Sequence, residues 1–342
     1  MAPETSAVST TSSSACAPAA QPAAAGAGLV EGAGDLAVTT HQLTKSFGTG
    51  AKARTVVNRL DLAVPRGVVY GFLGPNGAGK STTMKMLLGL LAPSSGRVRL
   101  LGQDLDRRHR GALMARTGSM IEQPPGYAHL TGAENMRVVQ RMLGLTDAQV
   151  DRALSLVRLT EHKDRLVRSY SMGMKQRLGI AMALARQPEL LILDEPTNGL
   201  DPAGTEEIRH LLVGLAAQGV TVMVSSHLLD EIDKMATVLG ILSSGHLVFQ
   251  GTRDDLMARS VPDVRVVTPA RNLDARLLEG IAPASAVHLA PDGLQVEGLA
   301  PQRVAEMVRR LVSAGAPVYE VRRQAQSLED VFMDLTGGAG VL

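Results

Sequence analysis

Aromatic residues and cysteine are scarce in this chain. Phenylalanine, tryptophan and tyrosine make up 2% of its 342 residues, and tryptophan is absent. Surfaces that stack nucleic-acid bases are built from aromatic side chains, so this composition argues against a protein that binds single-stranded nucleic acid. The single cysteine, Cys16, excludes an intrachain disulfide and a metal cluster held by several thiolates. Such cysteine usage is typical of a reducing compartment.

Long apolar runs and an excess of one charge are also missing. A membrane-spanning helix needs about 20 consecutive apolar residues, and the best candidates, residues 84–93 and 220–227, are shorter or interrupted. The formal net charge of +2 is small for a nucleic-acid binder that relies on counterion release. Hydrophobic residues make up 45% of the chain, as in ordinary globular proteins. We therefore expect a globular chain with an aliphatic, methionine-rich core and no membrane span.

The first 35 residues consist largely of Ala, Ser, Thr, Pro and Gly. They lack the basic start of a secretory signal and the arginines of a transit peptide. Their composition cannot bury enough apolar surface to offset the entropy of an ordered chain. We expect residues 1–35 to form a disordered tail.

Short apolar runs alternate with helical patterns from residue 36 onward. Buried strands are predicted at residues 68–74, 190–194 and 221–226. Helical patterns lie at residues 131–144, 147–158, 171–186 and 203–218. This alternation predicts an α/β fold with a mainly parallel sheet, in a domain spanning residues 36–260. Because the stretch from about 118 to 186 is nearly all helical, we expect a helical insertion there.

A glycine-rich loop follows the first of these strands. Residues 74–81, GPNGAGKS, match the phosphate-binding pattern G-x-x-x-x-G-K-[ST] between a strand and a helix. Backbone N–H groups would surround the β-phosphate, Lys80 would reach the β- and γ-phosphates, and the Ser81 hydroxyl would bind Mg²⁺. The sequence therefore predicts a site for a nucleoside triphosphate. Its residues are Gly74, Asn76, Gly77, Gly79, Lys80, Ser81 and Thr82.

Two acids stand at the end of the second predicted strand, LLILD. Asp194 would hold Mg²⁺ through water, and Glu195, one residue further, would polarise an attacking water molecule. A strand ending in Asp-Glu is common by itself. Together with the glycine-rich loop, it favours hydrolysis of the bound triphosphate.

A second candidate anion site opens a helix at residues 169–174, SYSMGM. Serine suits an N-cap, Gly173 allows close approach to the backbone, and Lys175 and Arg177 add positive charge. The order of motifs is GPNGAGKST, SYSMGMKQR, LLILDEP, NGLD and SSH. Over residues 36 to about 250 this order resembles the nucleotide-binding subunits of ABC transporters. In that family two subunits pack head to tail, so the resemblance assigns the second anion site to the ATP of the partner.

The resemblance implies ATP and Mg²⁺ as cofactors and assigns roles to individual residues. Glu195 and His227 are implied as catalytic residues, His227 through contact with the γ-phosphate. Ser171 and the Gly173 backbone would donate to the γ-phosphate held by the partner subunit. Phe47 is similar to the aromatic residue that stacks on adenine, although a plain core position explains it nearly as well. Residues 198–201, NGLD, look like the loop that crosses the dimer interface, where its aspartate would sense the partner's site.

Two positions depart from the family pattern. The family's LSGGQ reads YSMGM at residues 170–174, which keeps the backbone donors but loses the glutamine. The switch glutamine is, by register, Glu122, with Gln123 next. A glutamate could still bind Mg²⁺ beside Ser81 and Asp194, but it would repel the γ-phosphate. Which of the two residues faces the metal stays open.

The order of predicted strands and helices changes after about residue 262. Strands are predicted at residues 264–268, 286–290, 294–298 and 318–324, with helices near 275–280, 301–315 and 327–336. The order βαββαβ predicts a ferredoxin-like α+β domain over residues 261–342. The ending SLEDVFMDLTG resembles that of drug- and antibiotic-export ATPases of the daunorubicin, bacitracin and lantibiotic-immunity type. A brace for the dimer or for the last helix is an equally good reading of this domain.

The resemblance implies an ATP-binding subunit that drives a separate membrane-spanning permease at the cytoplasmic face of the membrane. Its partners would be that permease and a second nucleotide-binding subunit, identical or paralogous. A groove near residues 118–135 would receive a helix of the permease, and an antibiotic or other amphipathic compound would be exported. The alternative is a soluble ABC-type ATPase that acts on ribosomes or DNA. Such proteins usually have two nucleotide domains or long coiled coils, and this sequence has one copy of each motif and no sustained heptads.

Overall fold

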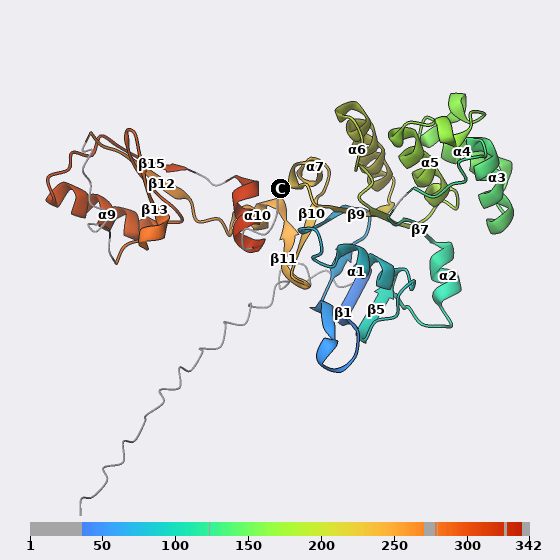
Figure 1. The fold of residues 1–342 in the computed structure, drawn as a ribbon, viewed down its shortest axis with the longest axis horizontal. Coiled ribbons are helices and arrows are strands. Elements are labelled where there is room, and N and C mark those ends of the chain that lie inside the picture. Colours follow the sequence, from blue (N-terminus) through green and yellow to red (C-terminus); the bar gives the residue numbers. More distant parts are fainter. Residues whose placement is uncertain (1–35, 123, 270–277, 279, 325–326, 337–342) are drawn as a thin grey trace, which may run out of the picture.

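The computed structural model describes residues 36–336, apart from residues 123, 270–277, 279 and 325–326. The tail expected at residues 1–35 and most of the helix expected near 275–280 lie outside the described residues. The remaining chain forms a large unit and a small one, and Figure 1 shows the small unit standing to one side of the large one.

A six-stranded sheet organises the large unit, with the strand order β11-β10-β4-β9-β8-β7. Its strands are β4 (Val69–Leu73), β7 (Thr117–Met120), β8 (Leu190–Asp194), β9 (Thr221–Ser226), β10 (Val238–Ser243) and β11 (His246–Thr252). Neighbouring strands are parallel except for the β10–β11 hairpin. Strands β4, β8 and β9 are buried along their whole length, as expected for parallel strands covered on both faces. The predicted mainly parallel sheet is confirmed.

The register of this sheet brings three strand ends to one edge. Leu73 of β4 pairs with Ser226 of β9, and Asp194 of β8 pairs with Ser225 of β9. The chain segments that follow these strands are the glycine-rich loop, Glu195 and His227. In parallel α/β sheets this carboxyl edge is where ligands bind.

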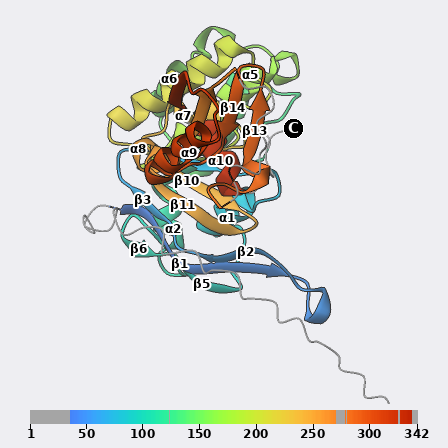
Figure 2. The same ribbon diagram turned by 90° about the vertical axis from the view of Figure 1, so that its left-hand side faces the viewer.

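A second, antiparallel sheet was not anticipated from the sequence. It consists of β1 (Leu36–Phe47), β2 (Arg54–Leu60), β3 (Ala63–Pro65), β5 (Ser95–Leu100) and β6 (Gln103–Asp104). Figure 2 shows β1, β2 and β5 below the strands β10 and β11 of the main sheet. This sheet and one face of the main sheet, represented by Phe72 and Ile192, share one hydrophobic cluster. The opposite face of the main sheet, represented by Leu73 and Leu193, belongs to another.

The longer helices match the predicted stretches, whereas the short helices α2, α7 and α8 were not predicted. In chain order the helices are α1 (Lys80–Leu87), α2 (Arg110–Ala115), α3 (Gly132–Leu143), α4 (Asp147–Leu156), α5 (Met172–Leu184), α6 (Pro202–Ala217), α7 (Leu229–Asp233), α8 (Arg253–Met257), α9 (Pro301–Ser313) and α10 (Leu328–Thr336). Short 3₁₀ turns occupy Gly50–Lys52, Thr160–His162, Val167–Ser169 and Ala284–Ala286. None of the helices within the described ranges has the length and apolar character of a membrane span.

The helical insertion contains α3, α4 and α5. Capping boxes define two of its helix starts, because Thr131 pairs with Glu134 at α3 and Thr146 pairs with Gln149 at α4. The expected start of the insertion at residue 118 is wrong. Residues 117–120, TGSM, form β7, which pairs with β8 at the edge of the main sheet. The sequence pattern did not predict this strand because it is four residues long and mostly polar.

The small unit has a four-stranded antiparallel sheet with the order β13-β14-β12-β15. Its strands are β12 (Asp263–Val267), β13 (Val287–Ala290), β14 (Gly293–Val296) and β15 (Glu320–Gln324). Side chains of β12 and β14 share a separate hydrophobic cluster with Met307 and Leu311 of α9. The last helix, α10, leaves this unit and contacts α7, α8, β10 and β11 of the large one. Its residues Val331 and Phe332 are buried in the core cluster of the large unit.

Candidate functional site

The glycine-rich loop connects β4 to α1 in a conformation that requires glycine. Gly74, Gly77 and Gly79 have φ values of 156°, 81° and 107°. A Cβ atom on Gly74 would lie 2.3 Å from the carbonyl oxygen of Leu242, and one on Gly79 would lie 2.8 Å from that of Val56. The loop is therefore held tightly against neighbouring backbone, with its N–H groups at the start of α1.

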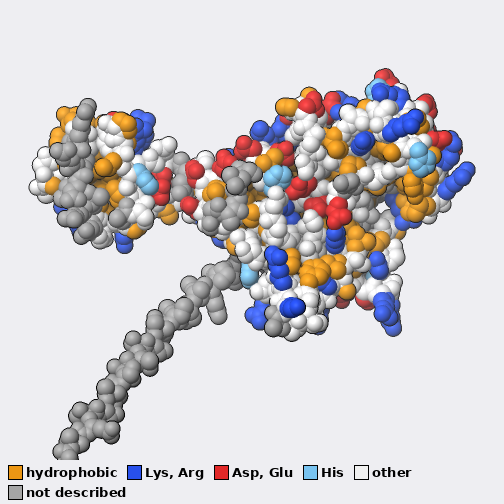
Figure 3. Space-filling model, in the orientation of Figure 1, with side chains coloured by type: hydrophobic (Ala, Val, Ile, Leu, Met, Phe, Trp, Pro, Cys, Tyr) orange, Lys and Arg blue, Asp and Glu red, His pale blue; other side chains and the backbone are white. Residues whose placement is uncertain are grey.

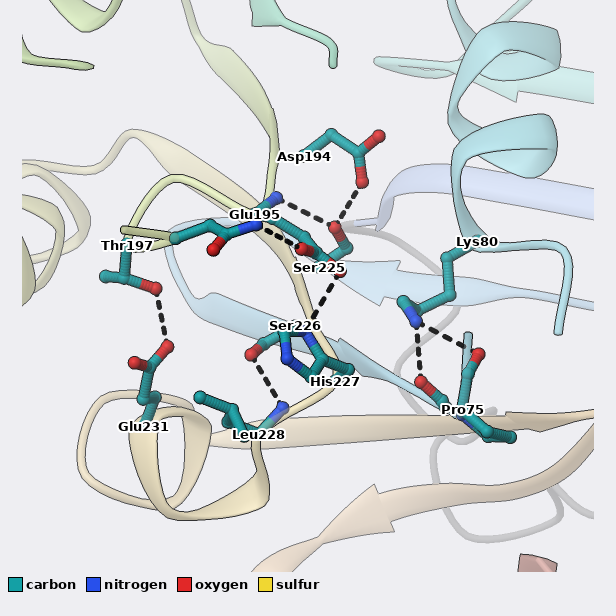
Figure 4. Close-up of polar contacts among 12 residues, drawn as sticks. Pro75, Lys80, Asp194, Glu195, Thr197, Ser225, Ser226, His227, Leu228 and Glu231 are labelled. Carbon is teal, nitrogen blue, oxygen red and sulfur yellow. Dashed lines mark hydrogen bonds and ion pairs between the residues drawn. The ribbon is translucent and has the colours of Figure 1, made fainter. Parts of the chain in front are cut away.

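Lys80 lies inside this loop. Its side chain is buried, and Nζ donates to the carbonyl oxygens of Gly74 at 2.6 Å and Pro75 at 3.2 Å (Figure 4). Burial lowers the pKa of the Lys80 ammonium, and the nearby carboxylates Glu195 and Asp194 oppose that change. These contacts place a cation at the centre of the loop.

The loop borders an open hollow of about 170 Å³. Its lining includes six predicted residues, Asn76, Gly77, Gly79, Lys80, Ser81 and Thr82, together with Val56 and Glu195. The seventh predicted loop residue, Gly74, contributes through its hydrogen bond with Lys80. The sequence motif thus assembles one site with a glutamate beside it.

Asp194 and Glu195 are joined through Ser225, which the sequence analysis missed. The Ser225 hydroxyl donates to Oδ1 of Asp194 at 2.5 Å and accepts from the backbone N–H of Glu195 at 3.0 Å (Figure 4). Ser225 is fully buried and lies opposite Asp194 in the register of β8 and β9. The sequence signal that could have identified Ser225 is its position two residues before His227. Ser225 fixes both the aspartate side chain and the backbone of the glutamate.

Glu195 is held from both sides. Its Oε1 lies 3.1 Å from Nδ1 of His227, and its Oε2 accepts from the Asn198 side chain at 3.1 Å. Its φ of 46° is in the left-handed region, which is costly for a residue with a side chain and is found at functional sites. Thr197, two residues on, donates to Glu231 of α7 at 2.5 Å. The carboxylate therefore has a defined orientation toward the histidine.

A larger cleft of about 600 Å³ separates this edge of the sheet from the helical insertion. Ser81, Asp194 and Glu195 line it from the sheet side, and Met172, Lys175 and Gln176 line it from α5. Glu122 also lines the cleft, so the three candidate magnesium ligands Ser81, Asp194 and Glu122 all border the same space. The Glu122 carboxylate forms an ion pair with Lys85 of α1, and its neighbour Gln123 lies outside the described residues.

Comparisons with known proteins agree with this geometry. A family model described as ABC transporter matches residues 57–198. The bacitracin transport ATP-binding protein BcrA of Enterococcus faecalis is 39% identical over 306 residues, which cover 89% of this chain and 97% of that protein. The chain belongs to the ATP-binding proteins of ABC transporters. It is therefore an ATPase built on the P-loop fold.

Two further relatives differ in how much of the chain they cover. The lantibiotic transport ATP-binding protein SrtF of Streptococcus pyogenes is 42% identical over 212 residues, covering 62% of this chain and 89% of that protein. The solved structure of CbiO1 from Clostridium perfringens, part of an ABC transporter complex, has a TM-score of 0.60 at 28% identity, and covers 66% of this chain and 92% of that one. The ATPase unit is common to all of them, whereas the longer alignment with BcrA extends beyond it.

The signature motif of this ABC ATPase opens α5, and its Met172 lines the same cleft as Ser81. Ser171 caps α5 by accepting from the Met174 N–H at 3.2 Å, and neither Ser171 nor Gly173 is among the residues that line the loop hollow or the cleft. A Cβ atom on Gly173 would lie 3.5 Å from the Leu200 side chain, so the signature motif packs beside residues 198–201. Asp201 in turn caps α6 by accepting from the Gly204 N–H.

Phe47 ends β1 and is 44% exposed, so the plain core position considered for it is wrong. Its strand partner is Arg54, two residues before Val56, which lines the loop hollow. The ammonium of Lys45 lies 5.2 Å from the centre of the Phe47 ring. The Phe47 ring is therefore accessible to solvent. It lies on the β1–β2 strand pair, which borders the hollow.

Proposed function

We propose that this ABC ATPase acts as a pair of subunits that drives a separate membrane-spanning permease and exports an antibiotic or another amphipathic compound. The observation that carries the proposal is the alignment with a bacitracin transport ATP-binding protein over 97% of that protein's length. The alignment of 306 residues is long enough to include most of the small C-terminal unit, whereas the alignment with SrtF is limited to 212. This favours a relationship to the bacitracin type, including its accessory part.

The two candidate anion sites stand at the starts of two different helices, α1 and α5, which supports pairing of two subunits. Lys80 and Ser81 line a hollow on one part of the chain, while Ser171 and Gly173 present a helix start elsewhere. In the proposed dimer, the α5 start of one subunit donates to the γ-phosphate bound by the other. Residues 198–201 pack beside the same signature motif, and in this proposal Asp201 would respond when the partner's site fills. Phe47 would stack on the adenine ring.

Magnesium fits the residues of the cleft when phosphate oxygens complete its coordination. Ser81, Asp194 and Glu122 supply hard oxygen donors, which Mg²⁺ prefers. Among the described residues no cluster of three or more His, Cys, Asp or Glu side chains forms a ready metal site. Mg²⁺ characteristically uses one or two carboxylates together with substrate phosphates, so binding of the ion would depend on the nucleotide. When bound, it would neutralise charge on the phosphates.

The catalytic roles follow from the contacts around Glu195. Its carboxylate would orient and polarise the attacking water, while Asn198 and His227 hold its two oxygens in place. His227 would also contact the γ-phosphate from the end of β9. Lys80 would exchange its loop carbonyls for β- and γ-phosphate oxygens, which are stronger acceptors for a cation.

The permease would bind at the cytoplasmic face of the membrane, near residues 118–135. Tyr127 is 56% exposed there, and its ring packs edge-on with that of His129 at a centroid distance of 5.9 Å.

A soluble ATPase acting on ribosomes or DNA is less well supported. On the face drawn in Figure 3, cationic and acidic side chains are interspersed and form no continuous basic stripe on the described residues.

The proposal is tested in the organism that carries this chain. Deleting the coding sequence should lower the minimal inhibitory concentration of bacitracin or a lantibiotic, and the wild-type chain should restore it. The Lys80→Ala variant should not, whereas Lys163→Ala, on the surface of the insertion, should. Affinity capture from detergent-solubilised membranes should recover a multi-spanning protein. Unchanged sensitivity to every amphipathic antibiotic, with capture of ribosomes instead, would overturn the proposal.

A further inference from the structure

An ion pair borders the proposed magnesium site. Lys85 lies four residues after Ser81 on α1, so the two side chains project from the same face of this helix. The Lys85 ammonium pairs with the carboxylate of Glu122, which lines the same cleft as Ser81. Glu122 stands where the family pattern has a neutral glutamine, and nothing in the sequence points to Lys85 as its partner.

The cleft is rich in carboxylates. Glu122, Asp194 and Glu195 all line it, with Lys175 as a cation from α5. Asp194 is occupied by Ser225, and Glu195 by Asn198 and His227, whereas Glu122 has Lys85 as its ion-pair partner. A triphosphate adds several negative charges to this environment. An unpaired Glu122 would oppose that binding, because its carboxylate and the phosphates carry like charges.

The Lys85–Glu122 pair also positions the backbone turn at Glu122. Glu122 lies two residues beyond the end of β7 and has a φ of 67°, in the left-handed region that is unfavourable for a residue with a side chain. The chain turns there from the main sheet toward the insertion. Lys85 belongs to the helix that starts at the glycine-rich loop, so the pair connects that helix to the first turn of the chain leaving the sheet.

We infer that Lys85 is the counter-ion that makes Glu122 compatible with a triphosphate. The Lys85–Glu122 pair carries no net charge. Beside the γ-phosphate it is therefore electrostatically equivalent to a neutral glutamine. Lys85 acts through Glu122 and does not itself contact the nucleotide. This inference rests on the proposed function, because it places a nucleotide and Mg²⁺ in the cleft.

The test is a double-mutant cycle on nucleotide affinity. The chain is purified as wild type, Lys85→Met, Glu122→Gln and the double variant. Dissociation constants are measured by titration calorimetry with Mg²⁺ and a non-hydrolysable ATP analogue, and with Mg²⁺ and ADP. Thermal unfolding checks that each variant folds. This is expected because half-exposed ion pairs contribute little to stability (34% and 64% exposed here).

Lys85→Met should weaken binding of the ATP analogue about tenfold, and binding of ADP less, because the uncompensated charge faces the γ-phosphate. In the Glu122→Gln background, where no charge is left to compensate, Lys85→Met should change either constant by less than about threefold. Lys85→Arg should behave as wild type. Lys163→Met, which breaks the surface pair with Asp151, serves as the matched control and should leave both constants unchanged.

The alternatives give different results. If Lys85 contacted the phosphates directly, Glu122→Gln would fail to rescue Lys85→Met, and the inference would be wrong. Equal losses for ADP and the ATP analogue would likewise overturn the link to the γ-phosphate. Failure of the wild-type chain to bind either nucleotide would instead count against the proposed function, so the two failures are distinguishable.

Discussion

The Oε1 atom of Glu195 lies 3.1 Å from Nδ1 of His227, which comes 32 positions later in the chain. The two residues meet because Glu195 follows β8 and His227 follows β9. These strands are parallel neighbours, and their register ends both at the same edge of the sheet. The relationship depends on the sheet and not on any local motif. It supplies the acid with a fixed orientation beside the glycine-rich loop.

Replacing Glu195 with glutamine should separate binding from hydrolysis. The amide retains the size of the carboxylate and still meets Asn198 and His227, but it cannot take up a proton from water. We expect nucleotide affinity to stay within a few fold of wild type and hydrolysis to fall by about 10²-fold or more. Phosphate release measures the second quantity. Light scattering after size exclusion should show an ATP-bound dimer, and a monomer under saturating ATP would contradict the roles of Glu195 and Ser171.

Replacing Lys80 with alanine should abolish nucleotide binding. Its ammonium lies buried within the loop, and no other lysine or arginine lines the hollow formed by the described residues. The loss should exceed tenfold in the dissociation constant, because hydrogen bonds to charged groups contribute about 1.5–3 kcal/mol. Calorimetric titration provides the measurement, with Lys163→Ala as control. Retained affinity would remove Lys80 from the site.

Replacing Ser225 with alanine should disturb the positions of Asp194 and Glu195, although Ser225 itself does not contact the nucleotide. The change leaves the Glu195 N–H and the Asp194 carboxylate without a buried partner, which costs about 1–3 kcal/mol. We expect lower stability in urea and a lower kcat with a smaller effect on KM. The neighbouring Ser226 hydroxyl accepts from the Leu228 N–H, so Ser226→Ala is a matched control. Equal effects of both variants on kcat would show that the bridge at Ser225 has no special role.

The sequence predicted the glycine-rich loop and the acids because each is a local pattern at a strand end, whereas His227 came from the family resemblance. It did not predict Ser225 or Lys85, whose partners lie 31 and 37 positions away and meet them through sheet register or helix packing. Side-chain type alone does not reveal such pairings. The family resemblance identified Glu122, but its counter-ion became visible in the folded chain.

The antiparallel sheet escaped prediction for a different reason. Its long strand β1 pairs with three others, and register shifts interrupt its pairing with each of β2, β3 and β5. Such irregularities break the alternation of apolar and polar residues from which strands are predicted. Strand β7 was hidden by its polar composition. Elements with continuous apolar runs, such as β4 and β8, were predicted because burial on both faces leaves a clear pattern.

Replacing Phe332 with alanine should show whether the small unit communicates with the active edge of the sheet. Phe332 of α10 is almost fully buried in the core of the large unit, where α10 contacts α7. Helix α7 follows His227 and holds Thr197 through Glu231. We expect a loss of about 3–5 kcal/mol in the free energy of unfolding, measured in urea, and a several-fold lower kcat under conditions in which the variant is folded. Val312→Ala, at a position 57% exposed on α9, is the control and should change stability by less than about 0.5 kcal/mol. A folded Phe332→Ala variant with unchanged kcat would mean that α10 only anchors the small unit, because the path from α10 through α7 to the Glu195 loop would then carry no functional coupling.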